Sequence, residues 1–585
     1  MSLPTWDLTD LHPTIESLDA GLATAEEAAA TFESAYRGHV AGLDAPALAE
    51  ALRELEAIHD ALGRAYTFAY LNWSTNTADA ERGALLQRVK EAYTQTAQKL
   101  IFFDLEWIRV EDARAEALMQ DEALAGYKHY LEVERLERDH VLSEPEERLM
   151  SEKSITGRSA WTRFFDETLS SMRFEFRGES LTQQQTLAKL YEPDRELRQD
   201  AALAFTAGLQ DNLRTLAYVF NTLLADKATN DRLRGYPAWI TSRNRSNEVA
   251  DENVQALVDA VTDRYDLSAR FYDLKRRLLG YGEMFDYDRY APIGEADRKY
   301  SWDDARDLVL DAYGAFHPSM QQIAQRFFDD RWIDARLGDS KRGGAFSHGA
   351  VPSAHPYVLM NYTGKIRDVQ TLAHELGHGV HQYLSRSQGV LQADTPLTTA
   401  ETASVFGEML VFQRLMKAET DPAVRLAMLV GKLDDTMATV FRQVSMNRFE
   451  DAIHTRRRTQ GELTPDDFSE AWLRTQQAMF KDSVTLGEHY RHWWSYIPHF
   501  LHTPGYVYAY AFGELLVLAL YERYLQEGDG FTDAYLGLLE AGGSDWPHVL
   551  VGRLGVDLTD LDFWKQGLAV IDRMIGEAEA LAVLA

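Results

Sequence analysis

Cysteine is absent from this sequence of 585 residues. Its absence excludes disulfides, thiolate metal sites and a cysteine nucleophile, and it is compatible with a reducing compartment. Long apolar runs are also missing, because the most hydrophobic late segment, residues 511–520, is short and carries Glu514. Such a segment cannot cross a bilayer as a helix. The first fourteen residues lack a basic region followed by an apolar one, so we expect no signal peptide, no membrane partner and a cytoplasmic location.

Positive charge is scarce relative to negative charge. The chain has 60 Lys and Arg against 91 Asp and Glu, a formal net charge of −31, within an otherwise ordinary globular composition of 45% hydrophobic residues. A chain this acidic repels nucleic acid and anionic membranes, so we expect no nucleic-acid partner. The excess acid fits a solvated surface or a negative channel that favours cationic substrates, and the sequence does not decide between them.

Proline is missing between Pro46 and Pro145, where apolar residues recur at steps of three and four among good helix formers. This spacing is typical of amphipathic helices. The same pattern returns at 180–227, 250–280, 301–330, 398–440 and 508–526. Ser301 with Asp304 three residues later predicts a capping box at one helix start. The chain is therefore expected to be mainly helical, without internal repeats.

One region, residues 341–364, breaks the helical pattern. It is rich in glycine and proline around a short apolar run, Tyr357–Met360. Turn residues around such a run predict a strand, so we expect a small sheet just before the next helix. Domain boundaries are weakly marked, and a change near 180–200 suggests a helical region at 1–190 followed by a site-bearing region at 191–585.

The segment TLAHELGHGVHQYL, residues 371–384, contains an H-E-x-x-H motif. On a helix, His374 and His378 lie on one face and converge on one metal ion, while Glu375 projects beside them as a general base. Asp368 is placed to cap this helix. Gly377 costs about 1 kcal/mol of helix stability relative to alanine, which suggests that another segment approaches closely there.

A third metal ligand is needed to complete such a site. His381 points in nearly the same direction as His374, about 20° away around the helix, but lies two turns further along. It could reach the metal only if the helix unwound, so we expect it to pack or to support a ligand. A third histidine ten residues after His374 is excluded, because residue 384 is a leucine. The better source is a second expected helix at 398–416, where Glu401 and Glu408 share a face. One would ligate the ion while the other orients a ligand histidine.

HELGHGVH followed by AETASVFGE resembles the M3 zinc oligopeptidases, in particular their oligoendopeptidase F branch. The opening WDLTDLHPT, the KRGGAF segment and PHFLHTPGYVYAYAFGELL extend the resemblance over nearly the whole chain. It implies a large two-lobed helical gluzincin peptidase with a deep central channel and a small sheet next to the H-E-x-x-H helix. It also implies one Zn²⁺ per chain held by His374, His378 and Glu401, with Glu408 as a supporting residue.

The resemblance further assigns catalytic contacts within residues 497–516. His499, Tyr506 and Tyr510 match the family's histidine and tyrosines, although the spacing after the histidine differs and His502 competes with His499. We expect the tyrosines to donate to an oxyanion or to substrate carbonyls. The alternative is that tyrosines at even spacing only pack one face of a helix or strand.

Residues that bind the peptide backbone are expected around the predicted strand. An exposed strand edge pairs with an extended peptide, and glycines let the backbones approach. The expected substrate-binding residues of this region are Gly343, Gly344, His355 and Tyr357, and Tyr508 of the 497–516 stretch is expected to join them. The alternative for this region is a buried loop with turn glycines.

These patterns predict a zinc metalloendopeptidase that cleaves internal bonds of short peptides, with a monomer favoured. Two alternatives stay open. One is a related zinc exopeptidase of the dipeptidyl carboxypeptidase type, which would need a cationic clamp for a terminal carboxylate. The other is a catalytically idle peptide-binding protein, which would have no use for the base Glu375.

Overall fold

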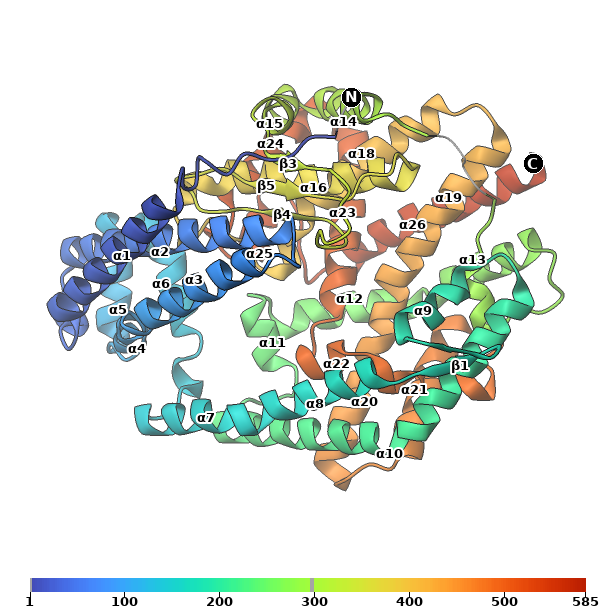
Figure 1. The fold of residues 1–585 in the computed structure, drawn as a ribbon, viewed down its shortest axis with the longest axis horizontal. Coiled ribbons are helices and arrows are strands. Elements are labelled where there is room, and N and C mark those ends of the chain that lie inside the picture. The colour runs from blue at the N-terminus through green and yellow to red at the C-terminus, as the bar shows by residue number, and fades with distance from the viewer. Residues whose placement is uncertain (1–2, 295–298, 585) are drawn as a thin grey trace. The chain divides into compact units, whose positions relative to one another are not determined.

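The computed structural model describes residues 3–294 and 299–584 and is mainly helical, with small sheets, as expected (Figure 1). The chain forms two compact units, each built from three segments. Unit 1 comprises Met1–Arg138, Asp297–Lys417 and Arg523–Asp557, and unit 2 comprises Asp139–Ala296, Ala418–Glu522 and Leu558–Ala585. The domain boundary expected near residue 190 stays a prediction.

Unit 1 contains the N-terminal helices and the H-E-x-x-H helix. Its helices are α1 (Ile15–Tyr36), α2 (Ala45–Ser74), α3 (Ala80–Gln98), α4 (Ile101–Ile108), α5 (Asp112–Met119), α6 (Lys128–Arg135), α14 (Trp302–Phe316), α15 (Pro318–Asp329), α16 (Ile366–Ser385), α17 (Leu397–Ala400), α18 (Thr402–Ala418), α24 (Asp529–Ala541) and α25 (Pro547–Gly552). The capping box predicted at the start of α14 is confirmed, because the Asp304 N–H donates to Ser301 Oγ and Asp304 accepts from the Ser301 N–H. Leucines spaced along α1 and α2 are buried in one core with Phe32 and Trp107.

A three-stranded sheet of unit 1 lies against α16 (Figure 1). Its strands are β3 (Ile333–Asp334), β4 (Phe346–His348) and β5 (Tyr357–Leu359), in the order β3-β5-β4. The predicted strand at Tyr357–Met360 is thus confirmed as β5. It pairs in parallel with β3 and antiparallel with β4, with Ser347 opposite Val358. Because β4 is an edge strand, one side of its backbone is not paired within the sheet.

The helix expected over 398–416 is interrupted. It forms as α17 and α18, which meet at Glu401, where φ is −83° and ψ is 0°. These angles lie in the bridge region between helix and extended backbone, which is sparsely populated and common at functional sites. The interruption is a feature that the apolar spacing alone did not predict.

Unit 2 is built around the long helix α10. Its helices are α7 (Glu144–Thr156), α8 (Arg158–Ser171), α9 (Gln183–Ala188), α10 (Arg195–Arg234), α11 (Thr241–Ser246), α12 (Asp251–Asp263), α13 (Tyr265–Leu278), α19 (Pro422–Thr436), α20 (Arg442–Gln460), α21 (Pro465–Phe480), α22 (His499–His502), α23 (Tyr508–Glu527, whose last turn passes into unit 1) and α26 (Leu561–Leu584), and its hairpin pairs β1 (Phe174–Phe176) with β2 (Glu179–Leu181). Asp194 caps the start of α10, and Gly235, at φ +73°, ends it.

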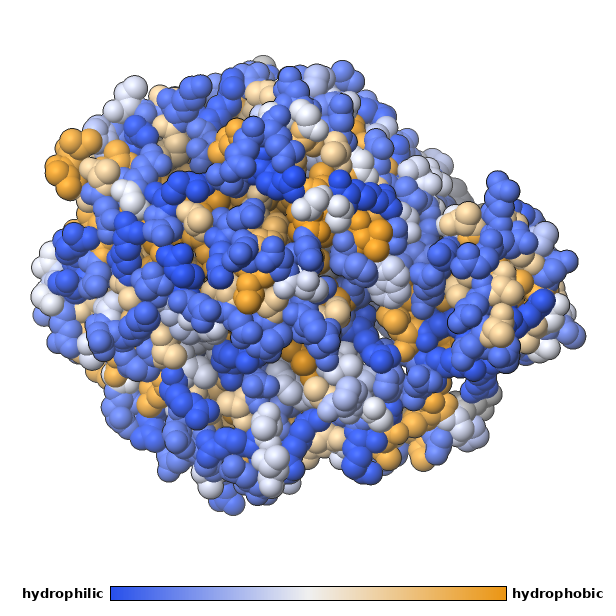
Figure 2. Space-filling model, turned by 180° about the vertical axis from the view of Figure 1, so that it is seen from behind, coloured by the Kyte–Doolittle hydropathy of each residue, from blue (hydrophilic) through white to orange (hydrophobic). Residues whose placement is uncertain are grey.

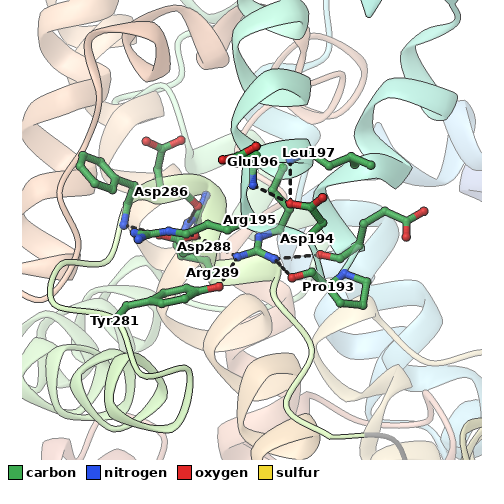
Figure 3. A network of polar contacts seen from close by, with 12 residues as sticks. Pro193, Asp194, Arg195, Glu196, Leu197, Tyr281, Asp286, Asp288 and Arg289 are labelled. Atoms are coloured by element: carbon green, nitrogen blue, oxygen red, sulfur yellow. Dashed lines mark hydrogen bonds and ion pairs between the residues drawn. The ribbon is translucent and has the colours of Figure 1, made fainter. Parts of the chain in front are cut away.

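A buried ion-pair network anchors the start of α10 (Figure 3). The carboxylate of Asp288 accepts from Arg195 at 2.7 Å and from Arg198 at 3.0 Å. Arg198 is fully buried, and it also donates to the carbonyls of Glu192 and Pro193 and to the hydroxyl of Tyr281. A buried charge is unfavourable unless an opposite charge pairs with it. We therefore interpret this network as one that stabilises the packing at the start of α10.

The surface is largely polar. Figure 2 shows a face on which hydrophilic residues predominate and hydrophobic ones are scattered, as expected for a net charge of −31. Within the residues that the structure describes, no helix combines the length and hydrophobicity needed to cross a membrane.

Candidate metal centre

Helix α16 presents the two histidines of the motif on one face. Its start is held by Asp368, whose carboxylate accepts from the Lys365 N–H at 3.1 Å and from the Thr363 N–H at 2.7 Å. A second face of the helix is buried in the core of unit 1. That face consists of Val369, Leu372, Leu376 and Val380, each with no exposed area. The amphipathic spacing therefore sets which way the histidines point.

Gly377 is a point where the backbones of α16 and α18 approach closely. A Cβ added at Gly377 would collide with the carbonyl oxygen of Ala403 and would lie 2.6 Å from Ser404 Cα. A side chain at this position would thus force the two helices apart. The close approach that the glycine suggested is present, and it brings the start of α18 beside the histidines.

His374, His378 and Glu401 form one cluster. The Nε2 atoms of both histidines lie 3.4 Å from Glu401 Oε2, and the two imidazole centroids are 5.0 Å apart. Their potential ligand atoms all lie within 4.8 Å of one another. Among the described residues, no other group of three or more His, Asp or Glu side chains has a geometry that could hold a metal ion. Two imidazoles and a carboxylate are the donor set of a catalytic zinc site, so the residues fit a metal ion.

The electrostatics of this cluster favour a cation. Burial alone would lower the pKa of His374, but its hydrogen bond with Glu408 and the charge of Glu401 raise it to about 9. Burial alone would raise the pKa of Glu401, yet its hydrogen bond with His378 and the two imidazoles lower it to about 2. The same carboxylates that stabilise an imidazolium would stabilise a divalent metal ion.

Glu408 lies on the other side of His374. Its Oε2 is 3.4 Å from His374 Nδ1, while His374 Nε2 faces Glu401. A carboxylate on Nδ1 fixes the tautomer that leaves Nε2 free to ligate. Glu408 thus lies at His374 Nδ1 and Glu401 at the two Nε2 atoms, and the supporting and ligating roles expected for them stay predictions.

Glu375 is buried beside the cluster, with 7% of its surface exposed. Burial raises the pKa of its carboxyl above the usual range. The N–H of Ser347 on β4 donates to this carboxylate, so the edge strand of the sheet orients it. Ser347 was not predicted, and it could have been found only from the pairing of β4 with β5.

A cavity of about 530 Å³ within unit 1 opens onto these residues. His374, Glu375 and His378 line it, and so do His381 and Asp394. His381 is buried and lies outside the three-residue cluster, and the packing or supporting role expected for it stays a prediction. Asp394 lies in a turn-rich segment without helical periodicity, so the sequence offered no signal for it.

The predicted substrate-binding residues of 341–364 are spread over different environments. Gly343 and Gly344 are exposed, and Gly344 adopts φ +78°. His355 is buried, stacks on Trp332 with centroids 4.0 Å apart, and its Nε2 lies 3.1 Å from Asp10 Oδ2. Tyr357 is fully buried in the sheet. None of these described residues lines the cavity beside the histidines, and their binding of substrate stays a prediction.

The predicted catalytic residues of 497–516 lie in unit 2 and gather there. His499 Nε2 is 3.4 Å from the hydroxyl of Tyr510, and the Tyr506 and Tyr510 rings are 4.9 Å apart. His502 instead points to Asp166, at 2.8 Å. The hydroxyl of Tyr508 is buried and accepts from Asn247 at 2.9 Å. The roles expected for His499, Tyr506, Tyr510 and Tyr508 stay predictions.

Comparison with known proteins covers nearly the whole chain. The sequence profile of peptidase family M3 matches residues 188–570, and that of oligopeptidase F matches residues 106–174. Oligopeptidase PepF of Bacillus subtilis (strain 168) is 29% identical over 99% of this chain and 87% of its own length. Group B oligopeptidase PepB of Streptococcus agalactiae is 26% identical over 98% of this chain and 96% of its own length.

Solved structures share the fold. A structure from Chlamydophila abortus aligns with a TM-score of 0.89 and 25% identity over 99% of this chain and 98% of that one. Oligoendopeptidase-F from Enterococcus faecium aligns with a TM-score of 0.73 and 22% identity over 97% of this chain and 99% of that one, a likeness of fold alone. The family profile covers more than half of the sequence and includes the histidine pair and Glu401. The chain therefore belongs to peptidase family M3, a family of metallopeptidases, and is a peptide hydrolase of the oligopeptidase F type.

Proposed function

We propose that this protein is a zinc-dependent endopeptidase that hydrolyses internal bonds of short peptides. The observation that carries the proposal is the cluster of His374, His378 and Glu401 with Glu375 beside it, all lining or adjoining one cavity. An idle peptide-binding protein would have no need of a carboxylate with a raised pKa next to a metal site. The cavity volume of about 530 Å³ lies in the range of pockets that bind small ligands, which suits part of a short peptide better than a folded protein.

In this proposal His374, His378 and Glu401 hold one Zn²⁺ per chain, and Glu408 fixes the orientation of His374. Zinc, when bound, lowers the pKa of a coordinated water and polarises a carbonyl oxygen. Cobalt or manganese could occupy the same donor set, so the identity of the metal is part of the test.

Glu375 acts as the general base in this proposal. Its raised pKa gives the carboxylate more affinity for a proton than an exposed glutamate has. It accepts a proton from the attacking water and passes that proton to the nitrogen of the departing amine. The Ser347 N–H keeps the carboxylate directed into the cavity during both transfers.

The edge strand β4 supplies a place for the peptide backbone. Ser347 and Phe346 of β4 line the cavity, and an extended peptide can add to an unpaired strand edge by main-chain hydrogen bonds. Binding of this kind reads the backbone rather than one side chain. Cleavage within a chain is favoured over trimming from a C-terminus, because no Lys or Arg is found among the described residues that line this cavity to bind a terminal carboxylate.

The test is cleavage of an internally quenched peptide of about ten residues, with mass mapping of the products. Internal cuts should disappear with a chelator and return with stoichiometric zinc. Glu375→Gln should lower kcat by a factor of about 10² to 10⁴ while retaining one zinc per chain, and Glu116→Gln, an exposed change on α5, should behave as wild type. Removal of residues from one end would indicate an exopeptidase instead, and tight zinc binding without cleavage would indicate a binding protein.

A further inference from the structure

The cavity beside the metal centre has one carboxylate that the proposed chemistry does not use. Asp394 lines this cavity together with Glu375 and His381. It lies in the segment that joins α16 to α17, seven residues before Glu401. The residue is accessible to solvent, although surrounding protein partly desolvates its carboxylate. Among the residues that the structure describes, none forms a hydrogen bond or ion pair with this carboxylate, which is therefore available to a ligand.

The backbone around Asp394 is held firmly. The carbonyl of Gln392 accepts from the Gly543 N–H at 2.9 Å, and the Ala393 N–H donates to Gly389 at 2.9 Å. The side chain of Gln392 is buried and donates to the Gly126 carbonyl at 2.6 Å. A Cβ at Gly543 would collide with the carbonyl oxygen of Asp394. The carboxylate is thus presented from a fixed position, which suits a specificity residue.

The charge of the cavity is one-sided. No Lys or Arg occurs among the described residues that line it. Glu375 and Asp394 are the carboxylates among the described residues that line the cavity. Glu375 lies beside the two histidines, where a metal ion would offset its charge, whereas no cationic side chain of the described residues pairs with Asp394. The surrounding protein also raises the pKa of the Asp394 carboxyl, because a partly desolvated carboxylate without a counter-ion is unfavourable. A cation beside it would remove that cost.

We propose that Asp394 makes this hollow a subsite for a positively charged group of the peptide substrate, either a Lys or Arg side chain or the N-terminal ammonium. This inference rests on the proposed peptidase function and adds a preference to it. The acidity of the sequence left open whether a negative channel favours cationic substrates. This inference places such a preference at Asp394. Hydrogen bonds between a charged donor and a carboxylate are stronger than neutral ones and discriminate against uncharged analogues.

The experiment uses one peptide scaffold in which a single Lys is moved through the positions on both sides of the cleaved bond. Each Lys peptide is paired with its norleucine analogue, which has a similar size and no charge. For the wild-type zinc enzyme, kcat/KM should be about tenfold higher for Lys than for norleucine at one position. A second set of peptides has an acetylated N-terminus and so lacks the terminal ammonium. A preference for that ammonium is lost on acetylation, whereas a preference for the Lys side chain is retained.

Asp394→Asn should bring the ratio of Lys to norleucine close to one, and Asp394→Lys should reverse it in favour of a Glu peptide. Asp394→Glu, which retains the charge, should keep a ratio above one, and the exposed control Asp339→Asn should keep the wild-type ratio. A wild-type enzyme without charge preference at any position would overturn the inference, as would an unchanged ratio in Asp394→Asn. Failure of the wild type to cleave any peptide would instead refute the proposed function, so the two failures are distinguishable.

Discussion

Three glutamates near the histidines differ in environment, and the environment separates their chemistry. Glu375 is buried, and its pKa is raised by desolvation. Glu401 faces two imidazoles, and its pKa is lowered to about 2 although burial opposes this. Glu408 meets the nitrogen of His374 that faces away from Glu401. In the proposed function, these three environments correspond to a base, a ligand and an orienting group.

At the scale of the residue, Glu408→Gln should weaken zinc binding by about 10- to 100-fold. The amide keeps the shape of the side chain but removes the charge that fixes the His374 tautomer. Zinc affinity of the metal-free protein would be measured by competition with a chromophoric chelator, which does not depend on activity. Glu116→Gln is the matched control. An affinity equal to that of the wild type would show that Glu408 does not orient the ligand.

At the scale of the element, the site depends on how two helices meet. Helix α16 directs both histidines by its periodicity, but Glu401 comes from the break between α17 and α18. The hydroxyl of Tyr313 on α14 donates to the Ala373 carbonyl at 2.5 Å, and a Cβ at Gly407 of α18 would lie 2.9 Å from Tyr313 Cζ. Helices α16 and α18 therefore meet backbone to backbone at Gly377, and the Tyr313 side chain joins α14 to both. A small displacement would separate Glu401 from the histidines.

Gly377→Ala tests this packing. The added Cβ collides with the backbone of α18, so the helices should separate, with a loss of about 1–3 kcal/mol in the free energy of unfolding and weaker zinc binding. Urea unfolding and zinc titration would measure the two effects. Gly537→Ala on α24 is the control, because no atom lies within 4 Å of its Cβ position and alanine should stabilise that helix. Equal behaviour of the two variants would contradict the packing argument.

At the scale of the whole molecule, stability depends on buried ionisable groups that lie far from the metal centre in the sequence. In unit 2, Glu450 on α20 is fully buried and accepts from the Gly505 N–H at 2.8 Å. Burial raises the pKa of Glu450 to about 8, and the hydrogen bond from Gly505 offsets only part of this rise. The folded protein therefore retains this proton at a pH where the unfolded chain has released it.

This proton predicts a specific pH dependence of folding. Because the folded state holds more protons than the unfolded state between about pH 4.5 and 8, Glu450 lowers stability as the pH rises through that window. From pH 6 to 9, the wild type should lose about 3 kcal/mol relative to Glu450→Gln. Urea unfolding at both pH values measures the difference, with the exposed Glu252→Gln as control. Parallel profiles for wild type and Glu450→Gln would exclude the proposed protonation.

The sequence by itself determined the local features of this protein. Spacing of apolar residues predicted the helices, turn residues around Tyr357 predicted β5, and the four-residue interval predicted that His374 and His378 share a face. These features depend on neighbours within about one or two helical turns, which a sequence displays directly.

Only the tertiary structure decided which distant groups meet. Helical spacing alone left Glu401 and Glu408 as alternatives, and only the resemblance to the M3 family favoured Glu401 as the ligand. The packing of α16 on α18 at Gly377 placed Glu401 at both Nε2 atoms and Glu408 at His374 Nδ1. The same applies to His355, which stacks on Trp332, and to Asp394, which reaches the cavity from an irregular segment. Contacts between segments far apart in the chain follow from how whole elements pack, and periodicity carries no information about them.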